Sequence, residues 1–171
     1  MSVVLLTNNP LLKSRLPDNP WPVFAQAGLK VAQAVQGGEG AAQKLTCIFF
    51  DADAKPVLAA ARDCIHNGWK LSHHPLYGNY RPHQQPYRSL VLTSPEPGSS
   101  GPDLFSLNLI EEALLIYNNH KVLAPAEAPA SLLDACALLD YELMRLPLEQ
   151  SGVISREDTF SAAPGEGKHC P

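Results

Sequence analysis

The stretch from His73 to Ser89 holds the residue types best suited to chemistry in this 171-residue chain. No acidic residue lies between Asp63 and Glu96, yet this window contains three basic residues and four of the six histidines. In a chain with a net charge of −4, such a cluster indicates a surface that meets an anion. Arg81 and Arg88 would pair with a carboxylate or a phosphate through their planar, forked donors.

Prolines and a glycine shape this loop. Pro75, Pro82 and Pro86 restrict its backbone, which lowers the entropy that the loop loses when it binds a ligand. Gly78 either lets a ligand approach the backbone or supplies a positive φ angle. The alternative is a rigid connection without a ligand, packed down by aromatic residues. These are Tyr77, Tyr80 and Tyr87.

We expect neither a metal nor a cofactor. The loop histidines His73, His74 and His83 have no Asp, Glu or Cys nearby to complete a ligand set, and adjacent residues in an extended segment point to opposite faces. The four cysteines are scattered, without the spacing of a zinc site or a disulfide framework. The sequence also lacks the glycine motifs that bind nucleotide phosphates.

Strand and helix patterns alternate along the chain. Apolar runs bounded by turn residues predict four strands, at residues 2–7, 45–50, 69–72 and 88–93. Helical spacing and capping residues predict the main helices, at residues 24–36, 53–67, 103–118 and 131–147. This order predicts an α/β fold with three layers, α/β/α, around a small, mostly parallel sheet of about four strands.

Two polar segments directly follow predicted strands, and we expect them to meet at one edge of the sheet. Ligands in open α/β sheets bind beyond the carboxyl ends of the strands. Asn8 and Asn9 follow the first strand, and the loop from His73 follows the third. The two asparagines either contact a ligand there or form a turn or helix cap before Pro10.

Length and charge limit the classes of function. Residues 1–150 are predicted to form a single α/β domain, and residues 151–171 a loosely ordered C-terminal tail. A pI near 5.8 argues against binding to nucleic acid or to an anionic membrane. No signal peptide and no membrane span is predicted, so the expected location is the cytoplasm. A homo-oligomer remains open.

Several segments are similar to a known family. Thr7-Asn-Asn-Pro10 resembles the TNNP opening of the GrdX family, and Arg62–Leu71 is similar to its RD-(hydrophobic)₂-H-x-G-H-K-L segment. His74–Ser89 resembles its HPLxGxxKP…PYKS block, and Asp140-Tyr141 is similar to part of its closing helices. The resemblance implies a small bacterial accessory or regulatory protein, encoded in glycine, sarcosine and betaine reductase operons, with a reductase-complex protein as partner.

These observations leave three hypotheses of function. The first is a non-catalytic module that binds a small anionic metabolite, an amino acid or an acyl phosphate. Its ligand-binding residues would be Asn8, Asn9, His74, Gly78, Arg81, Tyr87, Arg88 and Ser89.

The second hypothesis is a small enzyme in which His74 acts as acid and base and the two arginines clamp the anion. Asp51 or Asp140 would then have to orient the histidine in the fold. The third is a protein-interaction subunit whose partner meets the tyrosine-rich loop. We favour the non-catalytic module.

Overall fold

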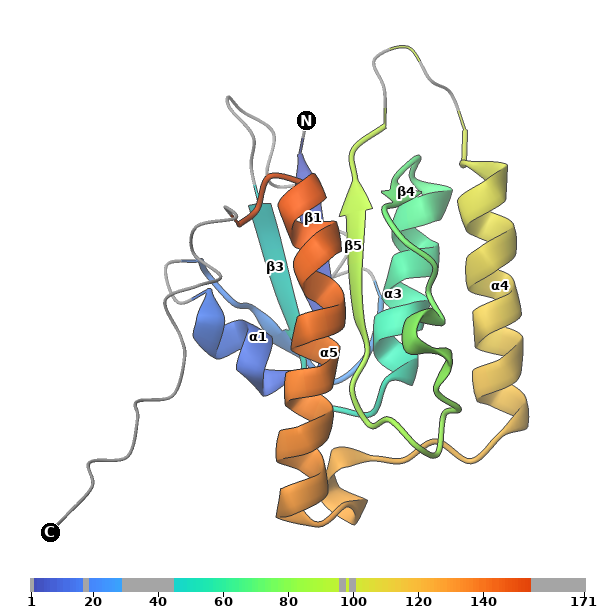
Figure 1. The fold of residues 1–171 in the computed structure, drawn as a ribbon. Helices are drawn as coiled ribbons and strands as arrows, with labels where there is room; N and C mark the ends of the chain where they lie inside the picture. The colour runs from blue at the N-terminus through green and yellow to red at the C-terminus, as the bar shows by residue number, and fades with distance from the viewer. Residues whose placement is uncertain (1, 17–18, 29–44, 96–97, 99–100, 155–171) are drawn as a thin grey trace, which may run out of the picture.

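The computed structural model describes residues 2–16, 19–28, 45–95, 98 and 101–154. Strands and helices alternate along most of this chain (Figure 1). The strands are β1 (Val3–Thr7), β2 (Val23–Phe24), β3 (Leu45–Phe50), β4 (Lys70–Leu71) and β5 (Ser89–Thr93). The helices are α1 (Pro10–Arg15), α3 (Lys55–His66), α4 (Leu104–Asn119) and α5 (Ala130–Gln150), with 3₁₀ turns at Tyr77–Asn79 and Pro125–Glu127.

The sheet is mixed and has five strands, in the order β2-β3-β1-β5-β4. β1, β2 and β3 run parallel to one another, whereas β5 is antiparallel to both β1 and β4. The expectation of a mostly parallel sheet of about four strands was therefore wrong. The connection from β4 to β5 contains one 3₁₀ turn and no crossover helix, so the chain returns in the opposite direction.

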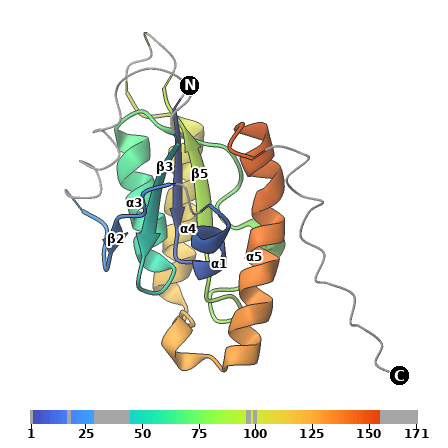
Figure 2. The same ribbon diagram turned by 90° about the vertical axis from the view of Figure 1, so that its left-hand side faces the viewer.

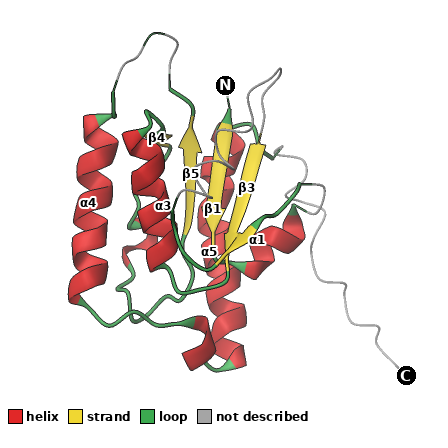
Figure 3. Cartoon of the chain, turned by 180° about the vertical axis from the view of Figure 1, so that it is seen from behind, coloured by secondary structure: helices red, strands yellow, loops and turns green. Residues whose placement is uncertain are grey.

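Helices cover both faces of the sheet, which gives the three layers (Figure 3). One apolar cluster joins α3 and α4 to side chains of β1, β3 and β5 such as Leu6, Phe50 and Leu90. A second cluster on the other face joins α1 and α5, through Leu12 and Met144, to the same three strands. Burial of these two faces supplies most of the driving force for folding.

The antiparallel pairing of β1 and β5 brings the two polar segments together. Thr7, the last residue of β1, lies opposite Ser89, the first residue of β5. Consequently the chain enters β5 at the edge of the sheet where β1 leaves it, and the Asn8 N–H donates to the Arg88 carbonyl oxygen at 3.4 Å. The prediction that these segments meet at one edge holds for their backbones.

The observed ends of the helices agree only in part with the predicted ends. Asp103 caps α4 as predicted, through its side chain and the Ser106 N–H. However, α5 begins at Ala130, directly after Pro129, and it continues past the predicted end at Pro147 to Gln150. Proline at that position has no N–H to donate within the helix, and both Pro147 and Leu148 are buried.

Two other predictions lie partly or wholly outside the described residues. Phe24, the expected start of a helix, lies in β2, and the rest of that helix falls largely among residues 29–44, which are not described. Val153 and Ile154 pack against the cluster around α5, whereas most of the expected tail, residues 155–171, is not described. Within the described part of the chain, no helix combines the length and apolarity needed to span a bilayer.

Candidate functional site

A buried carboxylate stands at the centre of the polar groups at this edge of the sheet. Asp140 of α5 has no exposed surface, and its two oxygens accept three side-chain hydrogen bonds. Asn9 Nδ2 donates at 2.8 Å, Ser89 Oγ at 2.7 Å, and the Tyr77 hydroxyl also donates. Burial raises the pKa of Asp140 above its usual value, although these hydrogen bonds and Arg88 act in the opposite direction.

The Asp140 carboxylate determines which hydroxyl group donates in each hydrogen bond of this cluster. Because Ser89 donates to Asp140, its Oγ accepts from the Thr7 hydroxyl at 2.6 Å. Thr7 Oγ1 in turn accepts the Asn9 N–H at 2.9 Å. The Ser89 N–H donates to the Tyr77 hydroxyl at 2.8 Å, which directs the phenolic proton to Asp140. All these polar groups are therefore satisfied by one another, as buried polar groups must be.

The side chains of Asn8 and Asn9 form hydrogen bonds within the fold. Asn8 Nδ2 donates to the carbonyl oxygens of Ala52 and Pro86, and its Oδ1 accepts the Arg88 N–H at 2.7 Å. Asn9 caps α1 through the Leu11 N–H, and its Nδ2 donates to Asp140 and to the Ala137 carbonyl oxygen. Neither amide retains a free donor hydrogen, so the turn-and-cap interpretation describes their geometry.

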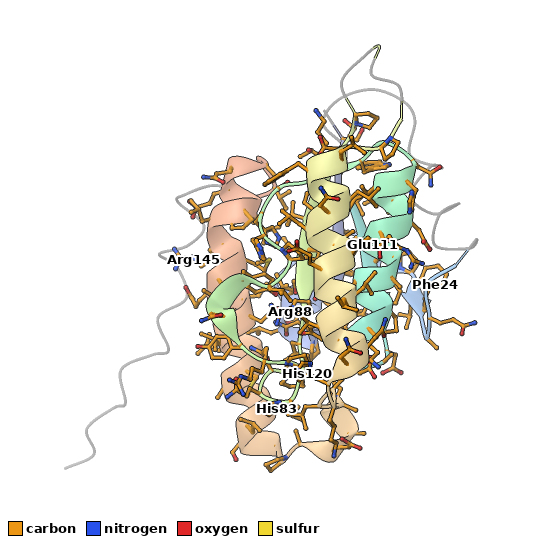
Figure 4. The ribbon with its side chains drawn as sticks, turned by 90° about the vertical axis from the view of Figure 1, so that its right-hand side faces the viewer. Phe24, His83, Arg88, Glu111, His120 and Arg145 are labelled. Atoms are coloured by element: carbon orange, nitrogen blue, oxygen red, sulfur yellow. The ribbon has the colours of Figure 1, made fainter. Side chains whose placement is uncertain are left out.

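Arg88, the residue before β5, is a buried cation that contacts α4 and the loop at Tyr77 (Figure 4). Its Nε donates to the Tyr117 hydroxyl at 3.2 Å, and its Nη1 donates to the Tyr77 carbonyl oxygen at 3.1 Å. The guanidinium carbon lies 4.6 Å from the centre of the Tyr77 ring and 5.9 Å from that of Tyr117. Nη2 is buried without a partner, and Arg88 forms no ion pair with any described residue.

The other predicted ligand-binding residues are spread over different environments. His74, Gly78 and Arg81 are exposed, whereas Tyr87 is buried against α5. Arg81 and Arg88 thus lie in different surroundings, one in solvent and one in the interior. Gly78 has a φ of +74°, and a Cβ atom there would lie 2.8 Å from the Tyr80 ring, so the backbone needs glycine at this position.

From residue types alone, Tyr77 had only a packing part in the loop, Tyr117 was not singled out as a site residue, and Asp140 had a different part. Asp140 was considered as an orienting group for His74, but it binds Tyr77, Ser89 and Asn9 instead. A usable signal existed: Asp140 follows Ala137 by three residues and precedes Met144 by four, on the buried stripe of α5. A charged residue on such a stripe needs buried partners.

His73 holds the start of the loop against β5. Its Nε2 accepts the Val91 N–H at 3.2 Å, so Nδ1 carries the proton and donates to the His74 carbonyl oxygen. The ring meets the edge of Tyr77 at a centroid distance of 5.2 Å. Burial, together with the positive charge of Arg88, lowers the pKa of His73 to about 4. In the described part of the chain, no three His, Cys, Asp or Glu residues are grouped as metal ligands.

The Asp140 cluster yields a prediction about stability. In Asp140→Asn, an amide hydrogen replaces one acceptor position, so at least one of the three donors loses its bond and Arg88 loses the nearby negative charge. We expect a loss of about 2–4 kcal/mol in the free energy of unfolding, measured by urea denaturation with circular dichroism. The matched control is Asp134→Asn, an exposed site on the same helix, which should change stability by less than about 0.5 kcal/mol. Equal effects of the two substitutions would contradict the central role of Asp140.

His73 predicts how stability depends on pH. Its pKa lies near 4 in the folded protein and near 6.5 when unfolded, so the unfolded state binds the proton more readily. Its contribution is complete above pH ~6.5 and is lost as the pH falls toward 4, which amounts to about 3 kcal/mol. Urea denaturation from pH 7 to 4 should show a shallower decline in His73→Gln, whereas His74→Gln should retain the wild-type slope. An unchanged slope in His73→Gln would refute the assignment.

Comparisons with known proteins agree with the motifs. A protein-family model described as GrdX-like protein matches residues 33–149, more than half of the chain. The matched range includes the loop, β5 and Asp140, whereas the Thr7–Pro10 motif lies before it. Searches of curated proteins and of solved structures found no match. The predicted resemblance is confirmed, and the chain belongs to the GrdX-like protein family.

Proposed function

We propose that this protein is a non-catalytic accessory or regulatory module of amino-acid reduction that binds a small anion through Arg88. The anion is the carboxylate of an amino acid or an acyl phosphate. One observation carries the proposal: Arg88 is a fully buried guanidinium that forms no ion pair with a described residue and has an unpartnered Nη2.

The energetics of a buried charge support an anionic ligand. Removing a charge from water costs several kcal/mol unless it is paired and hydrogen-bonded. The rings of Tyr77 and Tyr117 offset part of that cost through cation–π contact. The Asp140 carboxylate influences Arg88 electrostatically, but its hydrogen bonds go to other groups. A carboxylate or phosphate oxygen at Nη2 would supply the missing acceptor.

Arg81 supplies a second positive charge on the same loop. Its backbone N–H donates to Gln84 Oε1, which shapes this part of the loop, and its side chain is exposed. An exposed cation attracts an approaching anion over a distance of about one Debye length, roughly 8–10 Å in physiological salt. We therefore assign Arg81 to attraction of the ligand and Arg88 to its binding.

The arrangement favours this function over the enzyme. An acid–base histidine needs a second group that orients it. His74 is exposed, and its Nδ1 accepts the Leu76 N–H rather than donating to a carboxylate. Asp51 is exposed, and the three hydrogen bonds that Asp140 accepts come from other residues. Of the three tyrosines in the loop, Tyr87 is buried and Tyr77 is half-buried, so the one that a protein partner could reach is Tyr80, which is 37% exposed.

Isothermal titration calorimetry with acetyl phosphate, inorganic phosphate, glycine and acetate tests the proposal. At least one anion should bind, and at a concentration of 100 times its Kd it should stabilise the fold by about 2.7 kcal/mol. Arg88→Lys keeps the positive charge but loses the planar, forked donors of the guanidinium, so we expect the affinity to fall about tenfold or more. Arg81→Ala should weaken binding by a few-fold, with less effect at high salt.

The control is Arg62→Ala, since Arg62 lies on α3 and pairs with Asp63 away from this edge. It should leave anion affinity unchanged. The proposal fails if the wild-type protein binds none of the four anions. It also fails if a folded Arg88→Lys protein, verified by circular dichroism, binds the anion as tightly as wild type.

A further inference from the structure

A surface pocket of about 400 Å³ is lined by residues of α1 and α5. These two helices are neighbours in the fold (Figure 2). Tyr87 lines it from the sheet side, and it packs with Cys136 and Ala137 of α5. The next residue, Arg88, contacts Tyr117 of α4 on the other face. Arg88 is not among the residues that line the pocket.

The lining of this pocket is mostly apolar. Leu11 of α1, Leu133 of α5 and the Tyr87 ring contribute hydrophobic surface. Ser14 and Asp134 contribute the polar groups, and none of the described lining residues is basic. Asp134 is exposed and forms no ion pair with a described residue.

The basic residues of α1 are engaged elsewhere. Lys13 Nζ lies 5.0 Å from the centre of the Phe49 ring, and the Arg15 guanidinium carbon lies 5.5 Å from that of Tyr141. Burial raises the pKa of Tyr87, and Cys136 and the carboxylates of Asp134 and Asp140 add smaller contributions in the same direction. Of these three neighbours, the two carboxylates are the acidic ones, because burial also raises the pKa of the Cys136 thiol. The electrostatic environment of the pocket therefore favours a positive charge over a negative one.

We propose that this pocket binds a small organic cation, an alkylammonium ion, whose apolar part lies against Leu11, Leu133 and Tyr87 and whose charge faces Asp134. A volume of about 400 Å³ lies within the range of small-molecule sites. A carboxylate and an aromatic ring, such as those of Asp134 and Tyr87 in this lining, are groups that attract an ammonium ion. This site is independent of the anion site at Arg88.

Three probes with one carbon skeleton test the inference: isobutylammonium, isobutanol and isobutyrate. Titrated into the ¹⁵N-labelled full-length chain, they should shift the amide signals of Leu11, Leu133 and Ala137. The expected order of affinity is cation, then alcohol, then carboxylate, and a Kd of roughly 1–10 mM for the cation corresponds to about −3 to −4 kcal/mol.

Two variants and a control distinguish the contribution of the Asp134 charge from that of the pocket volume. Asp134→Asn should reduce the affinity for isobutylammonium about two- to fivefold, to that of the alcohol, because an exposed ion pair contributes modestly. Ser14→Phe fills the pocket from an exposed position on α1 and should abolish binding of all three probes. Glu142→Gln, at an exposed carboxylate of α5 that does not line the pocket, should bind the cation like wild type.

The inference is overturned if no probe shifts these amides at about 50 mM, since that places any Kd outside the useful range. It is also overturned if the alcohol binds as tightly as the cation, or if Glu142→Gln weakens binding as much as Asp134→Asn. Tighter binding of Nα-acetyl-lysine amide than of isobutylammonium would assign the pocket to a lysine side chain of another protein instead. None of these results bears on the anion site, because Arg88 is unchanged in every variant.

Discussion

The hydrogen bonds to one buried carboxylate connect the separate parts of this structure. Asp140 of α5 binds Asn9 at the start of α1, Ser89 at the start of β5 and Tyr77 of the covering loop. A carboxylate without these donors would be costly in the interior, and each donor would be left unsatisfied without the carboxylate. The position of α5 on the sheet and the closed conformation of the loop therefore depend on the same group.

Tyr77 relates this carboxylate to the buried cation. Its hydroxyl donates to Asp140, its ring stacks on Arg88, and its carbonyl oxygen accepts from Arg88 Nη1. The two opposite charges are thus brought into one cluster through a neutral residue, without a direct ion pair. Such an arrangement lowers the free-energy cost of burying both charges. It still leaves Nη2 of the Arg88 guanidinium without a hydrogen-bond acceptor. Tyr77 therefore contacts both the buried Asp140 cluster and the candidate binding group, Arg88.

The sequence predicted many of the elements because local rules determine them. The apolar runs of β1, β3 and β5 and the Asp103 cap of α4 follow from patterning and capping chemistry. The direction of β5 did not follow, because strand direction depends on which edge the chain reaches after a long loop. The burial of Asp140 on α5 did not follow either, because its hydrogen-bonding partners come from distant segments.

By itself the sequence determined the family, the three-layer α/β class and the segments that carry polar groups, because these depend on residues close together along the chain. Only the tertiary structure decided that Asn8 and Asn9 serve the fold, that Arg81 is in solvent and that Arg88 is buried beneath Tyr77 and Tyr117. It also placed Tyr87, but not Arg88, in the lining of a surface pocket. The reason is that burial and hydrogen-bond partners come from contacts between residues many positions apart, which no local pattern encodes.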